Sequence, residues 1–432
     1  MRRFANSPCY LRLSMLFFTG AIALSVLSLA GRAIGQTSAG SSNAVDSLVP
    51  AKAGGVLRLA TFNVSLNRPQ AGKLAEDLSK DDSQARSIAA VIRAVRPDVL
   101  LLCEVDYSTE SNNAETFASE YLAAAKTDKL GGAAIEYEYV YSAPVNTGEA
   151  SGLDLNDNGK TSDPEDAWGY GRFPGQYGMA VLSRYPIATD QIRTFQTLRW
   201  SVMPDALRPR MPDGESYYDD ATWKQLRISS KSFWDVPIEL QVGEAAVRLH
   251  LLASHPTPPA FDGPEDRNGC RNHDEIRLLV DYISGAAYFE DDSGKNQGLE
   301  EQAAFFVAGD LNSDPFDGGS RPEAIRDLLN HSRIATMDPP SSQGAVVAAK
   351  EQAKANLSHQ GEAAFDTGDF NDRSVGNLRI DYALPSSNFR VLSNGVFWPS
   401  LKAVKADMRE AVTECLKASD HHLVWVDVEL AK

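Results

Sequence analysis

The chain has 432 residues, of which 43% are hydrophobic, and a formal net charge of −16 at pH 7. Such an acidic chain repels polyanions at long range, so we expect no stable nucleic-acid partner. Four cysteines, one of them within residues 1–35, are too few for a disulfide scaffold, although a bridge between Cys270 and Cys415 stays open.

Residues 1–35 have the pattern of a secretory signal peptide. Arg2 and Arg3 precede an apolar stretch at 11–30, and small residues follow at Ala33 and Gly35. A retained membrane anchor is the alternative. Removing this segment, which has four arginines and no acids, changes the net charge to −20. We expect a secreted or periplasmic protein with no membrane span in its mature form.

Residues 36–54 are rich in Ser, Ala and Gly and predict a flexible leader. We expect 55–432 to form a single catalytic domain, because polar residues suited to one site run from Asn63 to Asp420. Long irregular stretches lie at 144–176, 196–236 and 340–375. The first two are rich in aromatic residues, so we interpret them as insertions that pack over a sheet and shape a pocket.

Apolar runs that predict strands alternate with amphipathic segments that predict helices. The expected helices are 84–96 and 272–287. The expected strands are 57–62, 99–103, 178–183, 238–242, 247–253, 304–308, 378–384, 389–392 and 423–428. Several consecutive strands have no helix between them, which favours a mixed sheet sandwich with outer helices over a doubly wound parallel fold.

Polar side chains follow four of these runs, and Asp420-His421-His422 directly precedes a fifth, in a way that suits phosphate-ester chemistry. Glu104 and Asp420 are natural ligands for Mg²⁺, with the amide of Asn63 as their partner. A histidine paired with a carboxylate, His421 with Asp381, is a good general base. The remaining candidates, which would orient water or bind the phosphate, are His255, Asp310 and Asn312.

Each of these residues also has an ordinary structural interpretation. Glu104 alone would be a solvated surface group, Asn63 a turn residue, and His255 a marker of a chain turn. Asp310 and Asn312 fit an Asx turn that caps a helix. It is their joint occurrence at successive strand ends that indicates an active site.

The ordered set resembles the endonuclease/exonuclease/phosphatase superfamily, which includes pancreatic-type deoxyribonuclease, apurinic endonucleases and sphingomyelinases. The matching pieces are 60–64, 97–104, 177–187, 254–256, 308–315, 379–382 and 419–422. The resemblance implies a four-layer α-β-β-α sandwich with two mixed, mainly antiparallel central sheets, and a bound Mg²⁺ or Mn²⁺.

By the same resemblance, Asn63, Glu104 and Asp420 surround the metal, and Asp381 and His421 form the base pair. It also implies that Asp310 and Asn312 act on the nucleophile and the phosphate. The chain departs from some members in two places. Ser65 stands where some repair nucleases have an acidic residue, and His255 replaces the tyrosine of the apurinic endonucleases.

A second motif lies in the first insertion and matches a calcium-binding loop. Its candidate ligands for a structural Ca²⁺ are Asp154, Asn156, Asn158 and Glu165. The alternative is a chance acidic loop, since Pro164 is unusual in such a motif and flanking helices are not evident.

The segment after His255 contains polar residues that we expect to line the mouth of the pocket. Arg267, Arg271 and Arg277 could bind a second phosphate, with Asn268 beside them. An ion pair that closes the loop through Glu265, Asp266 or Asp274 is the alternative.

The sequence therefore predicts a secreted metal-dependent phosphoesterase, monomeric, acting on a small molecule, a lipid or a nucleic acid. An endonuclease or exonuclease on DNA or RNA is one alternative. A non-catalytic secreted binding module on the same fold is the other, and the intact set of site residues argues against it.

Overall fold

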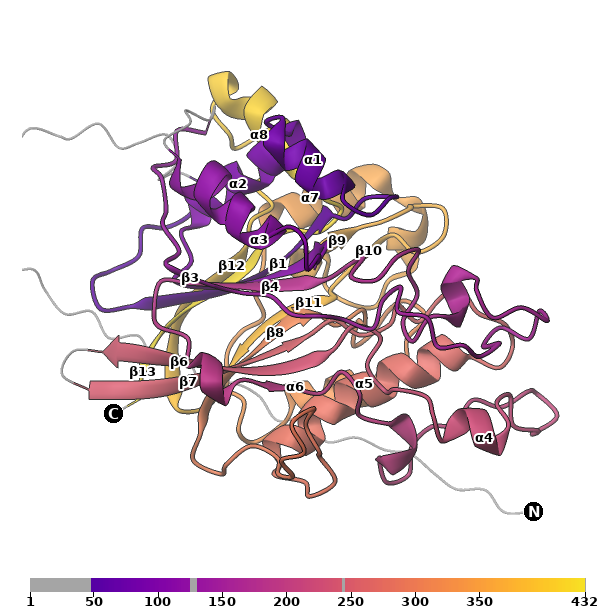
Figure 1. Ribbon diagram of the computed structural model, residues 1–432. Coiled ribbons are helices and arrows are strands. Elements are labelled where there is room, and N and C mark those ends of the chain that lie inside the picture. The colour runs from indigo at the N-terminus through magenta and orange to yellow at the C-terminus, as the bar shows by residue number, and fades with distance from the viewer. Residues whose placement is uncertain (1–47, 125–129, 243–244, 432) are drawn as a thin grey trace, which may run out of the picture. The chain divides into compact units, whose positions relative to one another are not determined.

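Two β-sheets pack face to face in the computed structural model, which describes residues 48–124, 130–242 and 245–431 (Figure 1). These residues all belong to one compact unit, Asn43–Lys432. The first sheet has the strand order β12-β13-β1-β2-β4-β3. Its strands are β1 (Leu57–Leu66), β2 (Val99–Val105), β3 (Tyr139–Tyr141), β4 (Met179–Ser183), β12 (Phe389–Val396) and β13 (Val424–Leu430).

The second sheet has the order β11-β8-β7-β6-β5. Its strands are β5 (Arg193–Thr194), β6 (Phe233–Val242), β7 (Ala245–Ser254), β8 (Ala304–Asp310) and β11 (Asp381–Pro385). Only the pairs β1/β2 and β7/β8 are parallel among the described strand pairs. A short ribbon of β9 (Gly368–Asp369) and β10 (Asn377–Leu378) lies apart from both sheets.

Helices cover the outer face of each sheet, so the predicted four-layer sandwich is confirmed. The first sheet is covered by α1 (Lys73–Ser79), α2 (Ser83–Val95), α3 (Asn113–Thr116) and α8 (Arg409–Leu416), and the second by α5 (Arg267–Ile283) and α6 (Glu323–Leu329) (Figure 1). Between the sheets, residues such as Leu59, Leu101, Leu251 and Phe306 form a central core with no exposed surface.

The local sequence explains where helix α2 begins and ends. The side chain of Asp82 accepts a hydrogen bond from the backbone N–H of Ala85, which caps the first turn. Apolar residues repeat every three or four positions and are buried against the sheet. Arg96 adopts the left-handed conformation that ends the helix. Our prediction of 84–96 was therefore close.

Helix α5 begins five residues earlier than predicted, at Arg267, and ends at Ile283 rather than at 287. Its first turns are polar, and several of their side chains are nevertheless buried, including Asn272 and Asp274. These buried polar side chains have partners in distant segments. The first turns of the helix therefore lack the apolar period that marks the rest of it.

Strand β6 is twice as long as the predicted strand at 238–242, because its pairing with β7 runs from Phe233↔Ser254 to Val242↔Ala245. The second insertion therefore ends at residue 232 and not at 236. Pro237 is tolerated within β6 because its carbonyl faces the irregular 186–188 segment, where it accepts from Ala188 N–H.

Glycines of the first insertion allow its backbone to approach neighbouring segments closely. A Cβ on Gly169 would lie 1.9 Å from the carbonyl oxygen of Ser230, and one on Gly175 would lie 2.3 Å from that of Tyr107. The stretch at 340–375, which we expected to be irregular, contains α7 (Gln343–Gln352), β9 and the 3₁₀ turns Lys354–Ser358 and Ala363–Phe365. The second insertion also contains the short helix α4 (Asp220–Trp223).

The predicted signal peptide and the first part of the leader lie outside the described residues. The end of the leader packs on the domain: Val49 is buried, and the Pro50 carbonyl accepts a hydrogen bond from Arg58. Cys103 and Cys270 are free and buried, so the open Cys270–Cys415 bridge is not formed. Within the described part of the chain, every helix is too short or too polar to cross a membrane.

Candidate active site

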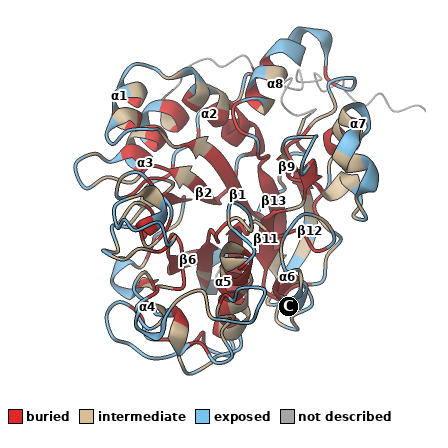
Figure 2. Ribbon diagram, turned by 90° about the vertical axis from the view of Figure 1, so that its right-hand side faces the viewer, coloured by how far each residue is buried: buried red, intermediate tan, exposed pale blue. Residues whose placement is uncertain are grey.

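The strand ends that carry the candidate residues meet at one edge of the sandwich. β1, β2, β7 and β8 end there, and β11 and β13 begin there, as their register shows. Figure 2 views the molecule from this side, with buried strands surrounded by intermediate and exposed loops. The sequence pattern of polar residues at strand ends thus becomes a cluster in space.

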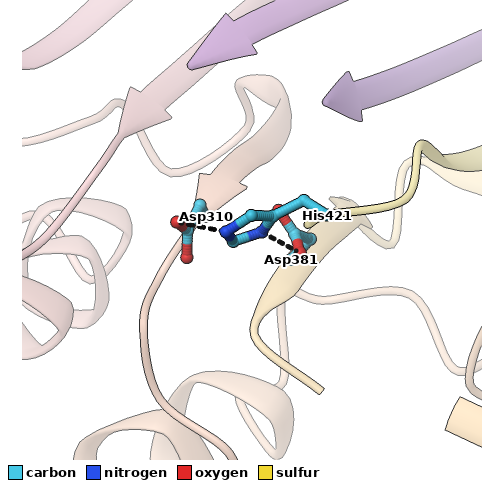
Figure 3. A group of neighbouring side chains, drawn as sticks. All are labelled: Asp310, Asp381 and His421. Atoms are coloured by element: carbon cyan, nitrogen blue, oxygen red, sulfur yellow. Dashed lines mark hydrogen bonds and ion pairs between the residues drawn. The ribbon is translucent and has the colours of Figure 1, made fainter. Parts of the chain in front are cut away.

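His421 lies between two carboxylates at the centre of this edge (Figure 3). Its Nδ1 is 2.9 Å from Oδ2 of Asp381, and its Nε2 is 3.7 Å from Oδ2 of Asp310. All three side chains are buried, and their ligand atoms lie within 4.8 Å of one another. The pairing of Asp381 with Asp310 across β11 and β8 brings the two acids together. Thr367 donates to Asp381 Oδ2 at 2.8 Å and fixes that carboxylate.

These contacts and the burial of the site shift the pKa values of all three groups. Burial alone would lower the pKa of His421, but the charges of Asp381 and Asp310 outweigh it and hold the pKa well above the ordinary value. Burial raises the pKa of Asp381 to about 6 despite the opposing charge of His421. For Asp310 the effect of burial is overcome by His421 and His255, and its pKa falls below the ordinary value. Asp310 is therefore ionised beside a readily protonated imidazole.

The metal-ligand candidates gather around a bend at the end of β1. Asn63 Nδ2 lies 3.2 Å from Glu104 Oε1 and 3.1 Å from Asp310 Oδ2, so it joins the two halves of the site. Ser65 donates to Asp420 Oδ1 at 3.1 Å. Asn67, which the sequence pattern did not single out, donates to the second oxygen of Glu104 at 2.7 Å.

The backbone is strained at this bend. Ser65 and Glu104 have φ values of 48° and 63°, which are uncommon for residues other than glycine. The register of β1 with β2 shifts between Asn63 and Leu66, as at a β-bulge. Such strain is concentrated at functional sites because the surrounding structure must hold it in place.

This donor set fits a hard divalent cation. Glu104 and Asp420 provide carboxylate oxygens and Asn63 an amide oxygen, the ligands that Mg²⁺ and Mn²⁺ prefer. Glu104 is only half-buried and Asp420 is exposed, so water can complete the coordination. The buried Asp310–Asp381–His421 group is contiguous with this set through Asn63.

His255 and Asn312 flank Asp310 on the other side. His255 Nε2 is 3.4 Å from Asp310 Oδ2, and burial lowers the pKa of His255. The Nδ1 atom of His255 is buried without a hydrogen-bond partner. Asn312 has a φ of 52° and donates its backbone N–H to Asp310 Oδ1 at 2.9 Å, which forms an Asx turn, although this turn does not cap a helix as the alternative interpretation expects. Its side-chain amide donates to the Pro256 carbonyl.

Comparison with family models matches residues 60–421 to the Endonuclease/Exonuclease/phosphatase family. The chain belongs to the endonuclease/exonuclease/phosphatase family. Members of this family are in general phosphoester hydrolases that depend on a divalent metal, and the buried Asp–Asp–His group is consistent with that dependence. The family resemblance predicted from the sequence is thus confirmed.

Several solved structures of low identity are similar to this chain over most of its length. A family protein from Beutenbergia cavernae is 19% identical with a TM-score of 0.46, and the match covers 87% of this chain and 72% of that one. Sphingomyelinase C from Streptomyces griseocarneus is 16% identical with a TM-score of 0.41, covering 86% and 99%. A mannosyl-6-phosphatase from Bacteroides thetaiotaomicron is 11% identical with a TM-score of 0.40, covering 86% and 99%. No curated protein matches the chain significantly.

The four residues predicted to bind substrate have other contacts in this family member. Arg271 donates to the carbonyls of Ile228, Arg227 and Trp168. Arg267 pairs with Glu265, and Asn268 donates to the Ala260 carbonyl. Arg277 contacts the carbonyls of Pro204 and Asp205 and pairs with Asp281. Of these contacts, the Arg267–Glu265 pair is the loop-closing ion pair of the alternative, and a role of the four residues in substrate binding stays a prediction.

The calcium-loop candidates lie in an Asx-rich turn of the first insertion. Asp154 accepts from the N–H groups of Asn158 and Gly159 at 3.1 and 2.7 Å. Asn156 Oδ1 is buried without a partner, and Glu165 is exposed. The loop is not part of the Asp–Asp–His group, and its binding of Ca²⁺ stays a prediction.

The sequence pattern missed Lys231, a buried lysine in the second insertion. Burial lowers the pKa of its ammonium, and the charges of Glu275, Glu104 and Asp310 oppose that effect. A polar Ser-Ser-Lys-Ser run directly before a strand was the available signal, and it is too common in loops to indicate a site.

Proposed function

We propose that this family member is an exported, Mg²⁺- or Mn²⁺-dependent phosphoesterase that hydrolyses a phosphate ester by water activated at His421. The observation that carries the proposal is the buried Asp310–His421–Asp381 arrangement, with one carboxylate on each ring nitrogen. A histidine that only stabilises the fold needs no second carboxylate. A general base near a phosphate uses one carboxylate to orient its ring and the other to orient the water.

Asp381 orients the imidazole through Nδ1, which leaves Nε2 to take a proton from water. The water oxygen forms the new bond to phosphorus while the bond to the alcohol oxygen breaks, and that oxygen keeps the electron pair and takes up a proton. Asp310, ionised and 3.7 Å from Nε2, orients the water. His255 and Asn312 lie where they can contact a phosphate oxygen.

Glu104, Asp420 and Asn63 are the residues that would hold the cation. When bound, the cation would neutralise charge that develops on the phosphate oxygens. Asn67 and Ser65 orient two of these ligands from behind, which keeps their oxygens in place.

Hydrolysis of bis-p-nitrophenyl phosphate with Mg²⁺ or Mn²⁺ tests the proposal. His421→Ala should reduce turnover by at least about 10²-fold, as expected for loss of a general base. His359→Ala is the matched control, because His359 is half-buried and its ring contacts only the Val375 carbonyl among the described hydrogen bonds. Full activity of a folded His421→Ala variant would refute the mechanism.

A phosphate-release screen over sugar phosphates, inositol phosphates, phospholipids, nucleotides and DNA would identify the class of substrate. We favour a small-molecule or lipid ester, because a chain with a net charge of −16 repels a long polyanion. DNA hydrolysis that weakens steeply with salt would instead favour the nuclease alternative.

A further inference from the structure

Lys231 is a buried cation with no counter-ion in contact. It belongs to the 229–232 segment, Ser229-Ser230-Lys231-Ser232, in which every residue is buried, and Lys231 itself is only 6% exposed. Among the described residues, its ammonium makes no hydrogen bond or ion pair, although its backbone carbonyl accepts from Asn146 at 2.8 Å. A lysine side chain that is almost fully buried and contacts no acid among the described residues is costly, so its position needs a reason.

The position of the 229–232 segment places Lys231 beside the active site. The segment runs directly into β6, whose first residue, Phe233, pairs with Ser254, the residue before His255. Ser230 Oγ lies 3.4 Å from the His255 carbonyl. The charge of Lys231 lowers the pKa of His255, second only to burial, while the acids that act on Lys231 include Glu104 and Asp310. The strand register and the Ser230 contact therefore place the 229–232 segment beside His255, and the charge of Lys231 interacts with Glu104 and Asp310.

The segment is held in this position by two distant groups. Glu275 of α5 accepts from Ser230 N–H and from Thr257 N–H, both at 2.6 Å, and so joins the segment to the chain just after His255. Asn146 donates to the carbonyl of Ser229 at 2.8 Å. Because both Glu275 oxygens already accept backbone hydrogen bonds, Glu275 acts on Lys231 only through space.

Charge balance explains what Lys231 would bind. Glu104, Asp310 and Asp420 together carry more negative charge than one divalent cation can neutralise. A second fixed cation at this edge would let a phosphate enter without net repulsion. An ammonium provides three donors, which suit the oxygens of a tetrahedral anion.

We propose that Lys231 forms an anion-binding subsite of this active site, in which its ammonium donates to a non-bridging oxygen of the phosphate group. The subsite rests on the proposed function for its biological ligand, but binding of phosphate by Lys231 can be measured without any turnover. A purely structural lysine, placed only to offset Glu104 and Asp310, is the competing explanation.

Titration of the metal-loaded protein with inorganic phosphate, followed by calorimetry and by thermal unfolding, tests the subsite. Lys231→Met should weaken phosphate binding by about 10- to 100-fold, the effect of losing one charge-assisted hydrogen bond. Lys231→Arg should retain most of the affinity. Lys402→Met, which removes an exposed lysine paired with Glu351, is the matched control and should bind as the wild type does.

The unfolding curves separate the two explanations. If Lys231 serves the anion, Lys231→Met without phosphate should unfold no earlier than the wild type, because a costly buried charge has been removed. A folded variant that binds phosphate with wild-type affinity would overturn the subsite. So would a variant that is strongly destabilised or fails to fold, because that result assigns a structural role.

The same measurements distinguish a failure of the subsite from a failure of the proposed function. If the wild type hydrolyses no phosphate ester but binds phosphate through Lys231, the proposed reaction fails and the subsite stands. If turnover is normal in Lys231→Met and phosphate affinity is unchanged, the reaction stands and the subsite fails.

Discussion

Glu275 is the residue whose replacement tests most directly how the site is assembled. Its two carboxylate oxygens accept from Ser230 and Thr257 N–H at 2.6 Å, and the side chain is buried. Glutamine has the same shape but one acceptor, so in Glu275→Gln an amide N–H₂ must face one of the two backbone N–H groups. One charge-assisted hydrogen bond is lost and one buried donor is left unsatisfied, which costs about 2–4 kcal/mol.

Urea unfolding measures this loss, and Glu301→Gln, on an exposed surface, is the control. For a chain longer than 250 residues the same loss lowers the melting temperature by about 2–8 °C. Hydrolysis should fall as well, because Ser230 and Thr257 flank Lys231 and His255-Pro256. A Glu275→Gln variant whose stability lies within about 0.5 kcal/mol of the wild type would refute the reasoning, since that is the range of neutral surface changes.

Four other expectations follow from the site and its surroundings. The pKa of His421 lies well above its ordinary value, because the charges of Asp381 and Asp310 outweigh burial, so kcat should rise with pH at higher pH than for an ordinary histidine base. Asp381→Asn should move this rise to lower pH. Asp366 has a pKa of about 8, so its ionisation opposes folding as pH rises from 4 to 8. In urea unfolding, Asp366→Asn should therefore raise the free energy of unfolding by ~2–5 kcal/mol at pH 9 and leave it unchanged near pH 3. Chelation should abolish turnover, and Mg²⁺ or Mn²⁺ should restore it; full activity in a chelator would exclude a metal enzyme. Calcium added to metal-free protein should release binding heat that Asp154→Ala removes, and the absence of heat in the wild type would exclude the calcium loop.

Much of the catalytic edge was predictable because strand ends are marked in the sequence. Asn63, Glu104 and Asp310 each follow an apolar run, and parallel or antiparallel pairing then brings the ends of neighbouring strands together. The order of these residues along the chain also matched a known family. The position of these residues at the ends of apolar runs, together with the period of the strands, was sufficient to predict this part of the site.

Lys231 and Glu275 could not be found in this way, because their roles depend on tertiary contacts. Lys231 follows serines in what looks like a solvated loop, and its burial requires Asn146 and Glu275 from other segments. Glu275 lies on the polar side of α5, where a carboxylate is normally exposed. The early start of α5 at Arg267 was missed for the same reason, since its polar side chains are buried against the insertions.

Helix α5 links the insertions to the catalytic strands through one polar face. Arg271 and Glu275 lie four residues apart, one turn along the helix, so their side chains project from the same side. Arg271 contacts the carbonyls of Trp168, Arg227 and Ile228, which belong to both insertions, while Glu275 contacts Ser230 and Thr257. Asn272 between them donates to the carbonyls of Thr257 and Leu311, next to His255 and Asp310. Since the same helix face holds the insertions and the catalytic strands, exchange of insertion residues that do not touch α5 should change substrate preference and leave the geometry of Asp310, Asp381 and His421 intact.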